Sequence, residues 1–129
     1  MFGVNLISDI SPLKTYKSNT IKVLFFLENK ICDINPLIDI DTPNLEELYL
    51  GSNITDISPL IKCKFPKLKQ LSLNNNKIQN ITMIKEFNFP NLELLVLSNN
   101  QIEKVGSLLK SNFPKLYEIS LKKNLFYNN

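Results

Sequence analysis

Six asparagines recur along this 129-residue chain at a nearly constant interval. They are Asn5, Asn29, Asn53, Asn76, Asn100 and Asn124, whose sequence numbers differ in succession by 24, 24, 23, 24 and 24. A fixed period of about 20–50 residues is the signature of a repeat architecture, in which each repeat packs against its neighbours. The chain is therefore expected to form a solenoid, a shape that usually presents a surface to partners.

Apolar residues occupy the same places in every repeat. Counted from each asparagine, they lie eight, five and three positions upstream and continue downstream, which gives L-x-x-L-x-L-x-x-N-x-I-x-x-I-x-x-L. The column five positions upstream holds Leu24, Leu48, Leu71, Leu95 and Ile119. The one shorter interval arises because no spacer separates Asn53 from Ile54, and every later column keeps its register.

This pattern resembles the leucine-rich repeat, L-x-x-L-x-L-x-x-N-x-L, over essentially the whole chain, with a longer unit of about 24 residues. Residues 53–60, NITDISPL, resemble repeats of bacterial internalins, and the isoleucine-rich pattern is similar to that of phosphatase regulators. The resemblance implies an α/β solenoid with a parallel sheet on its concave face and short helices or 3-10 turns on its convex face. We expect residues 1–129 to form a single leucine-rich repeat domain of about five repeats plus partial terminal turns.

The local structure of one repeat is also predictable. The L-x-L segment alternates apolar and variable residues, which indicates a short strand with one face inward. The asparagines are expected to be buried and to bond backbone groups after the strand, so that they form a ladder. Residue pairs beginning at Ser11, Asn35 and Ser58 and ending in proline predict the N-caps of short helices. A further column is expected to fill the convex side: Tyr16, Ile40, Cys63 and Phe87.

The composition argues against catalysis. The chain has no histidine, so neither a Ser-His-Asp triad nor a Cys-His pair can form. It has three glycines and no phosphate-binding loop, and its two cysteines lack zinc-ligand spacing. The neighbouring carboxylates of Asp39 and Asp41, and of Glu46 and Glu47, are not expected to face each other across a cleft. We therefore expect a protein that is not an enzyme and that binds no cofactor and no metal.

Charge is spread along the chain. The net charge is +3, from 15 lysines against 12 acidic residues, and no arginine is present. A nucleic-acid surface normally shows a concentrated basic stripe, so no nucleic-acid partner is expected. The absence of a signal peptide, a transmembrane run and cysteine-rich caps predicts an intracellular, cytoplasmic protein without membrane contact. Cys63 falls in a buried column and Cys32 among outward positions, so no disulfide is expected.

The variable strand positions are expected to point to the concave face and to bind a protein partner. They are Val23, Phe25, Leu27, Glu47, Tyr49, Gln70, Ser72, Leu94, Val96, Glu118 and Lys122. This surface is apolar and aromatic at its N-terminal end, rich in asparagine and serine in its middle, and charged at its C-terminal end. Contiguous apolar and aromatic side chains mark protein contacts. The first hypothesis is therefore a non-catalytic protein–protein interaction module, unless the partial first turn, residues 1–5, covers the apolar end.

Two other functions remain open at this point. The first and last turns carry no recognisable polar caps, which solenoids normally need. The chain could therefore pair end to end as a self-assembling structural protein or homo-oligomer. The similarity to phosphatase regulators implies, by analogy alone, a regulatory subunit of a phosphatase-type enzyme. The residues do not identify the partner.

Overall fold

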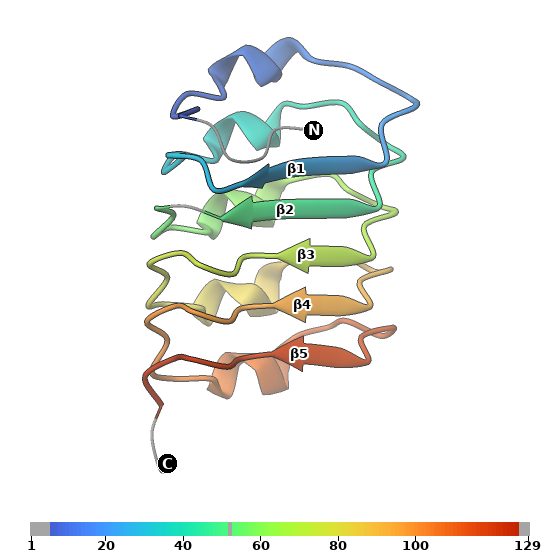
Figure 1. Ribbon diagram of the computed structural model, residues 1–129. Coiled ribbons are helices and arrows are strands. Elements are labelled where there is room, and N and C mark those ends of the chain that lie inside the picture. The colour runs from blue at the N-terminus through green and yellow to red at the C-terminus, as the bar shows by residue number, and fades with distance from the viewer. Residues whose placement is uncertain (1–5, 52, 127–129) are drawn as a thin grey trace.

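The computed structural model describes residues 6–51 and 53–126. Their strands lie one below the other in a single sheet (Figure 1). The strands are β1 (Val23–Leu27), β2 (Glu47–Gly51), β3 (Gln70–Ser72), β4 (Leu94–Val96) and β5 (Glu118–Ser120). They form a parallel sheet in the order β1-β2-β3-β4-β5. Parallel neighbours need a crossover, and here each crossover contains one short 3-10 helix.

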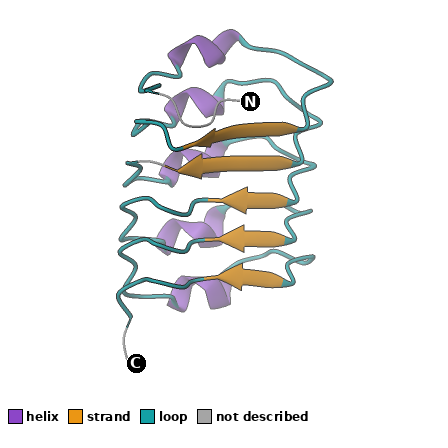
Figure 2. Cartoon of the chain, viewed as in Figure 1, coloured by secondary structure: helices purple, strands orange, loops and turns teal. Residues whose placement is uncertain are grey.

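The 3-10 helices form a second layer behind the sheet (Figure 2). They are η1 (Ser11–Thr15), η2 (Asn35–Ile38), η3 (Ser58–Lys62), η4 (Thr82–Glu86) and η5 (Gly106–Lys110). The predicted α/β solenoid with short helical turns opposite its parallel sheet is confirmed, and among the described residues the helical part is entirely 3-10. In the described part of the chain, no helix is long and apolar enough to cross a membrane.

The strand register follows the predicted leucine columns. Leu24 pairs with Leu48, Leu48 with Leu71, Leu71 with Leu95, and Leu95 with Ile119. The four leucines of this column are buried, whereas Ile119 at the C-terminal end is only partly buried. Because successive side chains of a strand point to opposite faces, these residues fill the space between sheet and helices and leave their neighbours on the other face.

A proline turn leads into four of the five strands. In each turn the backbone N–H of a leucine donates to the carbonyl three residues earlier, as in Leu68 to Phe65 at 3.2 Å and Leu92 to Phe89 at 3.1 Å. Proline suits the second position of such a turn because its φ is already fixed there. The four turns are at residues 42–45, 65–68, 89–92 and 113–116.

Neighbouring proline turns are bonded to each other through their third residues, which alternate between asparagine and lysine. The ammonium of Lys67 donates to Asn44 Oδ1, and that of Lys115 donates to Asn91 Oδ1 at 2.6 Å. Each of these asparagines also donates from Nδ2 to a backbone carbonyl of the preceding turn. The turns therefore tie adjacent repeats together in lysine–asparagine pairs.

The first residue of the proline turn is a buried phenylalanine in three repeats and a buried threonine in one. The rings of Phe65 and Phe89 stack with centroids 6.4 Å apart, and Phe113 continues the column. Thr42 holds this place in the second repeat and is 1% exposed. Its hydroxyl has no hydrogen-bond partner among residues 6–51 and 53–126. A buried hydroxyl without a partner destabilises the fold.

Substitution of Thr42 by valine should therefore stabilise the protein. The change keeps the β-branched shape and removes the unpaired hydroxyl, so the free energy of unfolding should rise by about 1 kcal/mol. Urea denaturation measures this as a higher midpoint with an unchanged slope. The exposed Thr55 offers a matched control, because Thr55→Val should stay within about 0.5 kcal/mol of the wild type. A lower midpoint for Thr42→Val would contradict this account.

The predicted N-caps are wrong. The cap residues of η1, η2 and η3 are Ile10, Ile34 and Ile57, and none makes a side-chain cap bond. For η1 to η4, a carboxylate or amide two residues before the helix accepts the first backbone N–H instead, at 2.8–2.9 Å. The acceptors are Asp9, Asp33, Asp56 and Asn80. Aspartate and asparagine readily form such turns, so this column supplies the helix start that serine was expected to supply.

The convex column is buried as predicted except at its first member. Ile40, Cys63 and Phe87 are 4–5% exposed, whereas Tyr16 is 37% exposed. Tyr16 follows the first helical turn of the described chain, where only one described repeat packs against it. Its backbone is nevertheless paired with the second repeat, because the Tyr16 carbonyl accepts from the Asp41 N–H at 3.0 Å.

The asparagine ladder is present and links each repeat to the one before it. Asn76 Oδ1 accepts from the Ile54 N–H at 3.1 Å, and its Nδ2 donates to the carbonyls of Leu50 and Leu73, both at 2.9 Å. Asn100 and Asn124 repeat this geometry one and two repeats later. Asn29 accepts from the Ile7 N–H at 3.2 Å. Asn5, also expected in the ladder, lies outside the described residues.

Asn53 does not belong to the ladder, which corrects the prediction. It is exposed, and its backbone N–H donates to the Ile31 carbonyl at 3.4 Å. In the following repeats the spacer residue after the ladder asparagine makes this bond, as when Lys77 donates to Ile54. Asn53 thus occupies the spacer position, so the residue missing from this repeat lies before Asn53 and not after it.

Candidate functional site

All of the predicted binding residues except Lys122 occupy strand positions that alternate with the buried leucine column, so they point to the side of the sheet opposite the core. We call this side the sheet face, and the 3-10 helices lie on the other side of the sheet (Figure 2). The paired strands bring them into rows: Val23, Glu47, Gln70, Leu94 and Glu118 form one, and Phe25, Tyr49, Ser72, Val96 and Ser120 form the next. Leu27 and Gly51 begin a third row, to which Lys122 was assigned by sequence. Val23, Glu118 and Lys122 are exposed, and the other predicted residues are partly buried, apart from Ser72.

Ser72 was predicted to be available to a partner and is not. It is 4% exposed because its small side chain lies between Tyr49 and Val96, its larger neighbours on the paired strands. Its hydroxyl donates to Asn74 Oδ1 at 2.7 Å. Ser72 therefore supports the middle of the sheet face without contributing an accessible side chain.

An aromatic pair forms the apolar end of the sheet face. The rings of Phe25 and Tyr49 have centroids 5.2 Å apart and are tilted by 45°, a separation at which aromatic pairs attract each other. Val23, on the same strand as Phe25, is 45% exposed. The expectation that residues 1–5 cover this end concerns residues outside those described.

The hydroxyl of Tyr49 is held by a carboxylate. It donates to Glu47 Oε2 at 2.6 Å. Burial, with the hydrogen bond to Glu47 and its negative charge, raises the pKa of Tyr49 to about 12. Tyr49 is therefore a neutral hydrogen-bond donor with a fixed ring orientation at physiological pH, which is a suitable state for an anchor in a protein interface.

The opposite end of the sheet face is polar. The hydroxyls of Ser98 and Ser120 lie 2.6 Å apart and satisfy each other. Glu118, Lys122 and Lys123 are exposed. The face therefore changes from aromatic at β1 and β2 to charged at and beyond β5, as the sequence indicated.

One ion network lies where the strands begin. The carboxylate of Glu46 accepts from the ammonium of Lys69 at 2.9 Å, and Lys22 lies 3.7 Å from its other oxygen. The hydrogen bond from Lys69 is the main reason why the pKa of Glu46 is lowered, and the same bond raises the pKa of Lys69. The two lysines are exposed to solvent and Glu46 is partly buried, so these ion pairs contribute little to the stability of the fold.

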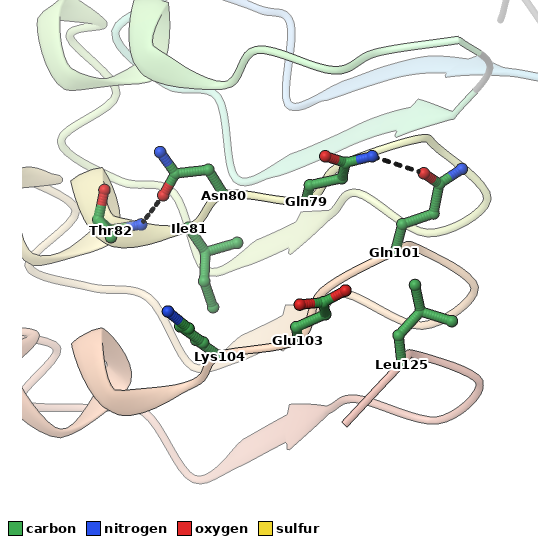
Figure 3. A pocket seen from close by; sticks show the side chains of 8 residues that line it. All are labelled: Gln79, Asn80, Ile81, Thr82, Gln101, Glu103, Lys104 and Leu125. Atoms are coloured by element: carbon green, nitrogen blue, oxygen red, sulfur yellow. Dashed lines mark hydrogen bonds between the residues drawn. The ribbon is translucent and has the colours of Figure 1, made fainter. Parts of the chain in front are cut away.

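A second concave region, not predicted from the sequence, lies on the flank where the chain leaves the asparagine ladder (Figure 3). It has a volume of about 380 Å³ and joins a similar hollow of about 390 Å³ through Gln79, Asn80 and Gln101. Gln79 Nε2 donates to Gln101 Oε1 at 3.0 Å, and Glu103 and Lys104 line the other side. The available signal for this region was the run of polar residues that follows the ladder asparagines, some of which the sequence places only at outward positions.

The cysteine and acidic side chains are dispersed over the described part of the chain. Within residues 6–51 and 53–126, no group of three or more Cys, Asp or Glu side chains is placed to hold a metal ion. Cys32 is exposed, Cys63 is buried, and both thiols are free. What the sheet face offers is a rigid array of side chains, because backbone pairing between strands fixes their spacing.

The comparisons with known proteins agree with this geometry. Residues 43–86 match a family model described as leucine-rich repeats, two copies. An internalin (inlF) from Listeria monocytogenes aligns over 95% of the chain with 30% identity and a TM-score of 0.73. Internalin C2 (inlC2) from the same organism aligns over 96% with 28% identity and a TM-score of 0.67. The chain spans 34% of the first structure and 62% of the second, and no curated protein sequence matches it.

Residues 43–86 are leucine-rich repeats by the family model, and the same apolar columns and parallel sheet continue on both sides of them. The solenoid of the chain is similar to those of the two internalins. Leucine-rich repeats generally serve as modules for protein interaction.

Proposed function

We propose that this protein is a non-catalytic binding module whose sheet face docks a protein partner. The observation that carries the proposal is the aromatic pair, Phe25 and Tyr49, on the outward side of the sheet beside the exposed Val23. Aromatic side chains whose bodies are partly buried and whose faces are open are enriched among the residues that dominate binding energy. The charged residues Glu118 and Lys122 at the other end would orient the partner and select against others.

Binding of the partner should be lost when both aromatic residues are replaced by charged ones. In Phe25→Glu/Tyr49→Glu, two carboxylates would face the apolar surface of the partner and would lose hydration without gaining a counter-charge. We expect the affinity to fall by at least about 100-fold, since each factor of ten corresponds to about 1.4 kcal/mol. The measurement is quantitative mass spectrometry of proteins cross-linked to the intact chain, followed by titration of the recovered partner.

A matched control is available on the same molecule. Leu109 is 91% exposed and Tyr117 is 73% exposed, and neither is on the sheet face. Leu109→Glu/Tyr117→Glu therefore makes the same kind of change and should leave the captured partner unchanged. Circular dichroism and melting must show that both double variants stay folded. A folded Phe25→Glu/Tyr49→Glu that still captures the partner would move the binding site away from the sheet face, and the flank around Gln79 and Gln101 would be tested next.

The same variant separates binding from self-assembly. If the chain pairs with its own copies through this face, the mass in solution should fall from oligomer to monomer in Phe25→Glu/Tyr49→Glu and no other protein should be recovered. Analytical ultracentrifugation of the wild type and both double variants measures this directly. A wild type that is already monomeric would leave the binding module as the proposed function.

A further inference from the structure

A small hollow lies at the end of the sheet face where β1 and β2 finish. Its volume is about 100 Å³, and its lining residues are Leu27, Glu28, Gly51 and Asn75. Glycine is needed here, since a Cβ on Gly51 would lie 2.7 Å from Leu27 Cδ2 and 2.9 Å from the Asn74 carbonyl oxygen. The hollow is therefore bounded by backbone and by the apolar side of Leu27. It has room for about three water molecules or a short alkyl chain.

The rim of the hollow carries polar groups that the protein does not use. Within the described residues, the Glu28 carboxylate and the Asn75 amide have no side-chain hydrogen bond or ion pair. The neighbouring acids differ, because Glu47 accepts from Tyr49 and Glu46 from Lys69. Glu28 is exposed, so its charge is available to a partner.

The backbone at the rim is held in an unusual conformation. Glu28 has φ 57° and Asn75 has φ 59°, both in the left-handed region. Asparagine tolerates that region better than most other residues. Asn99 and Lys123 have the same conformation in the fourth and fifth repeats, with φ 55° and 58°. The left-handed residue is therefore a recurring part of the repeat, and the hollow is distinguished by Gly51 and by the charge of Glu28.

We propose that the hollow takes one basic side chain, lysine or arginine, from the protein partner. Its methylene groups would pack against Leu27, and its charged head would donate to the Glu28 carboxylate and to Asn75 Oδ1. The Phe25–Tyr49 pair lies on the same strands and would hold an apolar neighbour of that basic residue. This inference rests on the proposed function, because it assigns part of the partner's chemistry at the same face.

Small cations test the hollow without the partner. ¹⁵N-labelled protein is titrated at low salt with n-butylammonium and n-propylguanidinium, and in parallel with the neutral n-pentanol and the anionic pentanoate. The cations should give saturable amide shifts at Leu27, Glu28, Gly51 and Asn75, and the neutral and anionic probes should not. Equal shifts from n-pentanol and n-butylammonium would show a merely apolar hollow and would overturn the proposal.

Two variants define the role of charge. Glu28→Gln keeps the size of the side chain and removes the charge, so the cation affinity should fall about fivefold, the effect of an exposed ion pair of about 1 kcal/mol. Asn75→Asp adds a carboxylate at a position whose backbone suits aspartate, so the affinity should rise by a similar factor. Glu86→Gln, at an exposed position in η4 and away from the sheet face, should change nothing. An unchanged affinity in both rim variants, or an equal loss in Glu86→Gln, would overturn the proposal.

Partner capture distinguishes this inference from the proposed function. If the cations bind as expected but Phe25→Glu/Tyr49→Glu still captures the partner, the hollow is a cation site and the proposed function fails. If that double variant loses the partner while Glu28→Gln keeps full affinity for it, the proposed function holds and the basic side chain is assigned wrongly.

Discussion

Replacing Asn76 by alanine should lower the free energy of unfolding by about 1–3 kcal/mol. Asn76 is 7% exposed, and its side chain satisfies the Ile54 N–H as well as carbonyls of its own and the preceding repeat. Alanine would leave the Ile54 N–H buried without a partner, and water cannot reach it. Urea denaturation measures the loss as a lower midpoint, and hydrogen exchange should show faster exchange of the Ile54 amide.

Two other asparagines provide controls for this substitution. Asn53→Ala should change the free energy of unfolding by less than about 0.5 kcal/mol, because Asn53 is exposed and bonds its neighbour through its backbone alone. Asn74→Ala should lie between the two, since it removes only the acceptor of the Ser72 hydroxyl. Equal losses for Asn76→Ala and Asn53→Ala would contradict the ladder as described.

The rate at which thiol reagents modify Cys63 should be about 10³-fold lower in the native protein than in the unfolded chain. Burial raises the pKa of the Cys63 thiol from 9.0 to about 12, and only the thiolate reacts. Such a change in pKa corresponds to about a thousandfold fewer thiolates at pH 8. Alkylation with iodoacetamide, followed by mass spectrometry with and without denaturant, measures this. The exposed Cys32 should react rapidly in both conditions, and fast native labelling of Cys63 would refute its burial.

The same thiol makes stability depend on alkaline pH. The folded state keeps the proton of Cys63 up to about pH 12, whereas the unfolded chain loses it near pH 9. The contribution is therefore fully present below pH 9 and is lost as the pH rises from 9 to 12, by up to about 1.4 kcal/mol per pH unit. The pKa of Tyr49 is also raised, so this group contributes to the dependence of stability on pH with the same sign. The slope of the free energy of unfolding against pH should therefore be measured in Cys63→Ala and in Tyr49→Phe, each of which removes one contribution.

The strand register could be predicted because burial imposes it on the residues themselves. Leu48, Leu71 and Leu95 must all point into the same core, and one slipped residue would turn each of them outward. The sheet order and the 3-10 crossovers follow from repeating that unit. The burial of Cys63 and the exposure of Cys32 were predictable for the same reason.

Details that depend on backbone geometry could not be predicted in this way. The one shortened interval shows that a residue is missing from a repeat but not where, and only the bond from Asn53 to Ile31 places the loss before Asn53. Serine before proline looked like a cap, although Asp9 and Asp33 were placed to accept the same N–H. Ser72 is buried by the size of its neighbours on other strands, which a single strand does not reveal.

The sequence was enough to predict which side of the sheet carries the candidate site, but not the hollow within it. Alternation along β1 and β2 was enough to place Phe25 and Tyr49 on the outward side. The hollow beside Gly51 depends on the absence of one Cβ and on the left-handed backbone at Glu28 and Asn75. Sequence reasoning treated Gly51 as one more variable position, and a glycine in a strand next to apolar residues was the signal available.

The lysine–asparagine bonds between proline turns give the solenoid a structural unit of two repeats. Asn44 is followed by Lys67, and Asn91 by Lys115, so the same contact returns every second repeat. Removing the repeat that contains Asn91 would place Lys67 against Lys115, two like charges in adjoining turns. Removing two consecutive repeats would restore an asparagine against a lysine. Duplication or loss of a two-repeat block is thus the change of length that keeps these contacts.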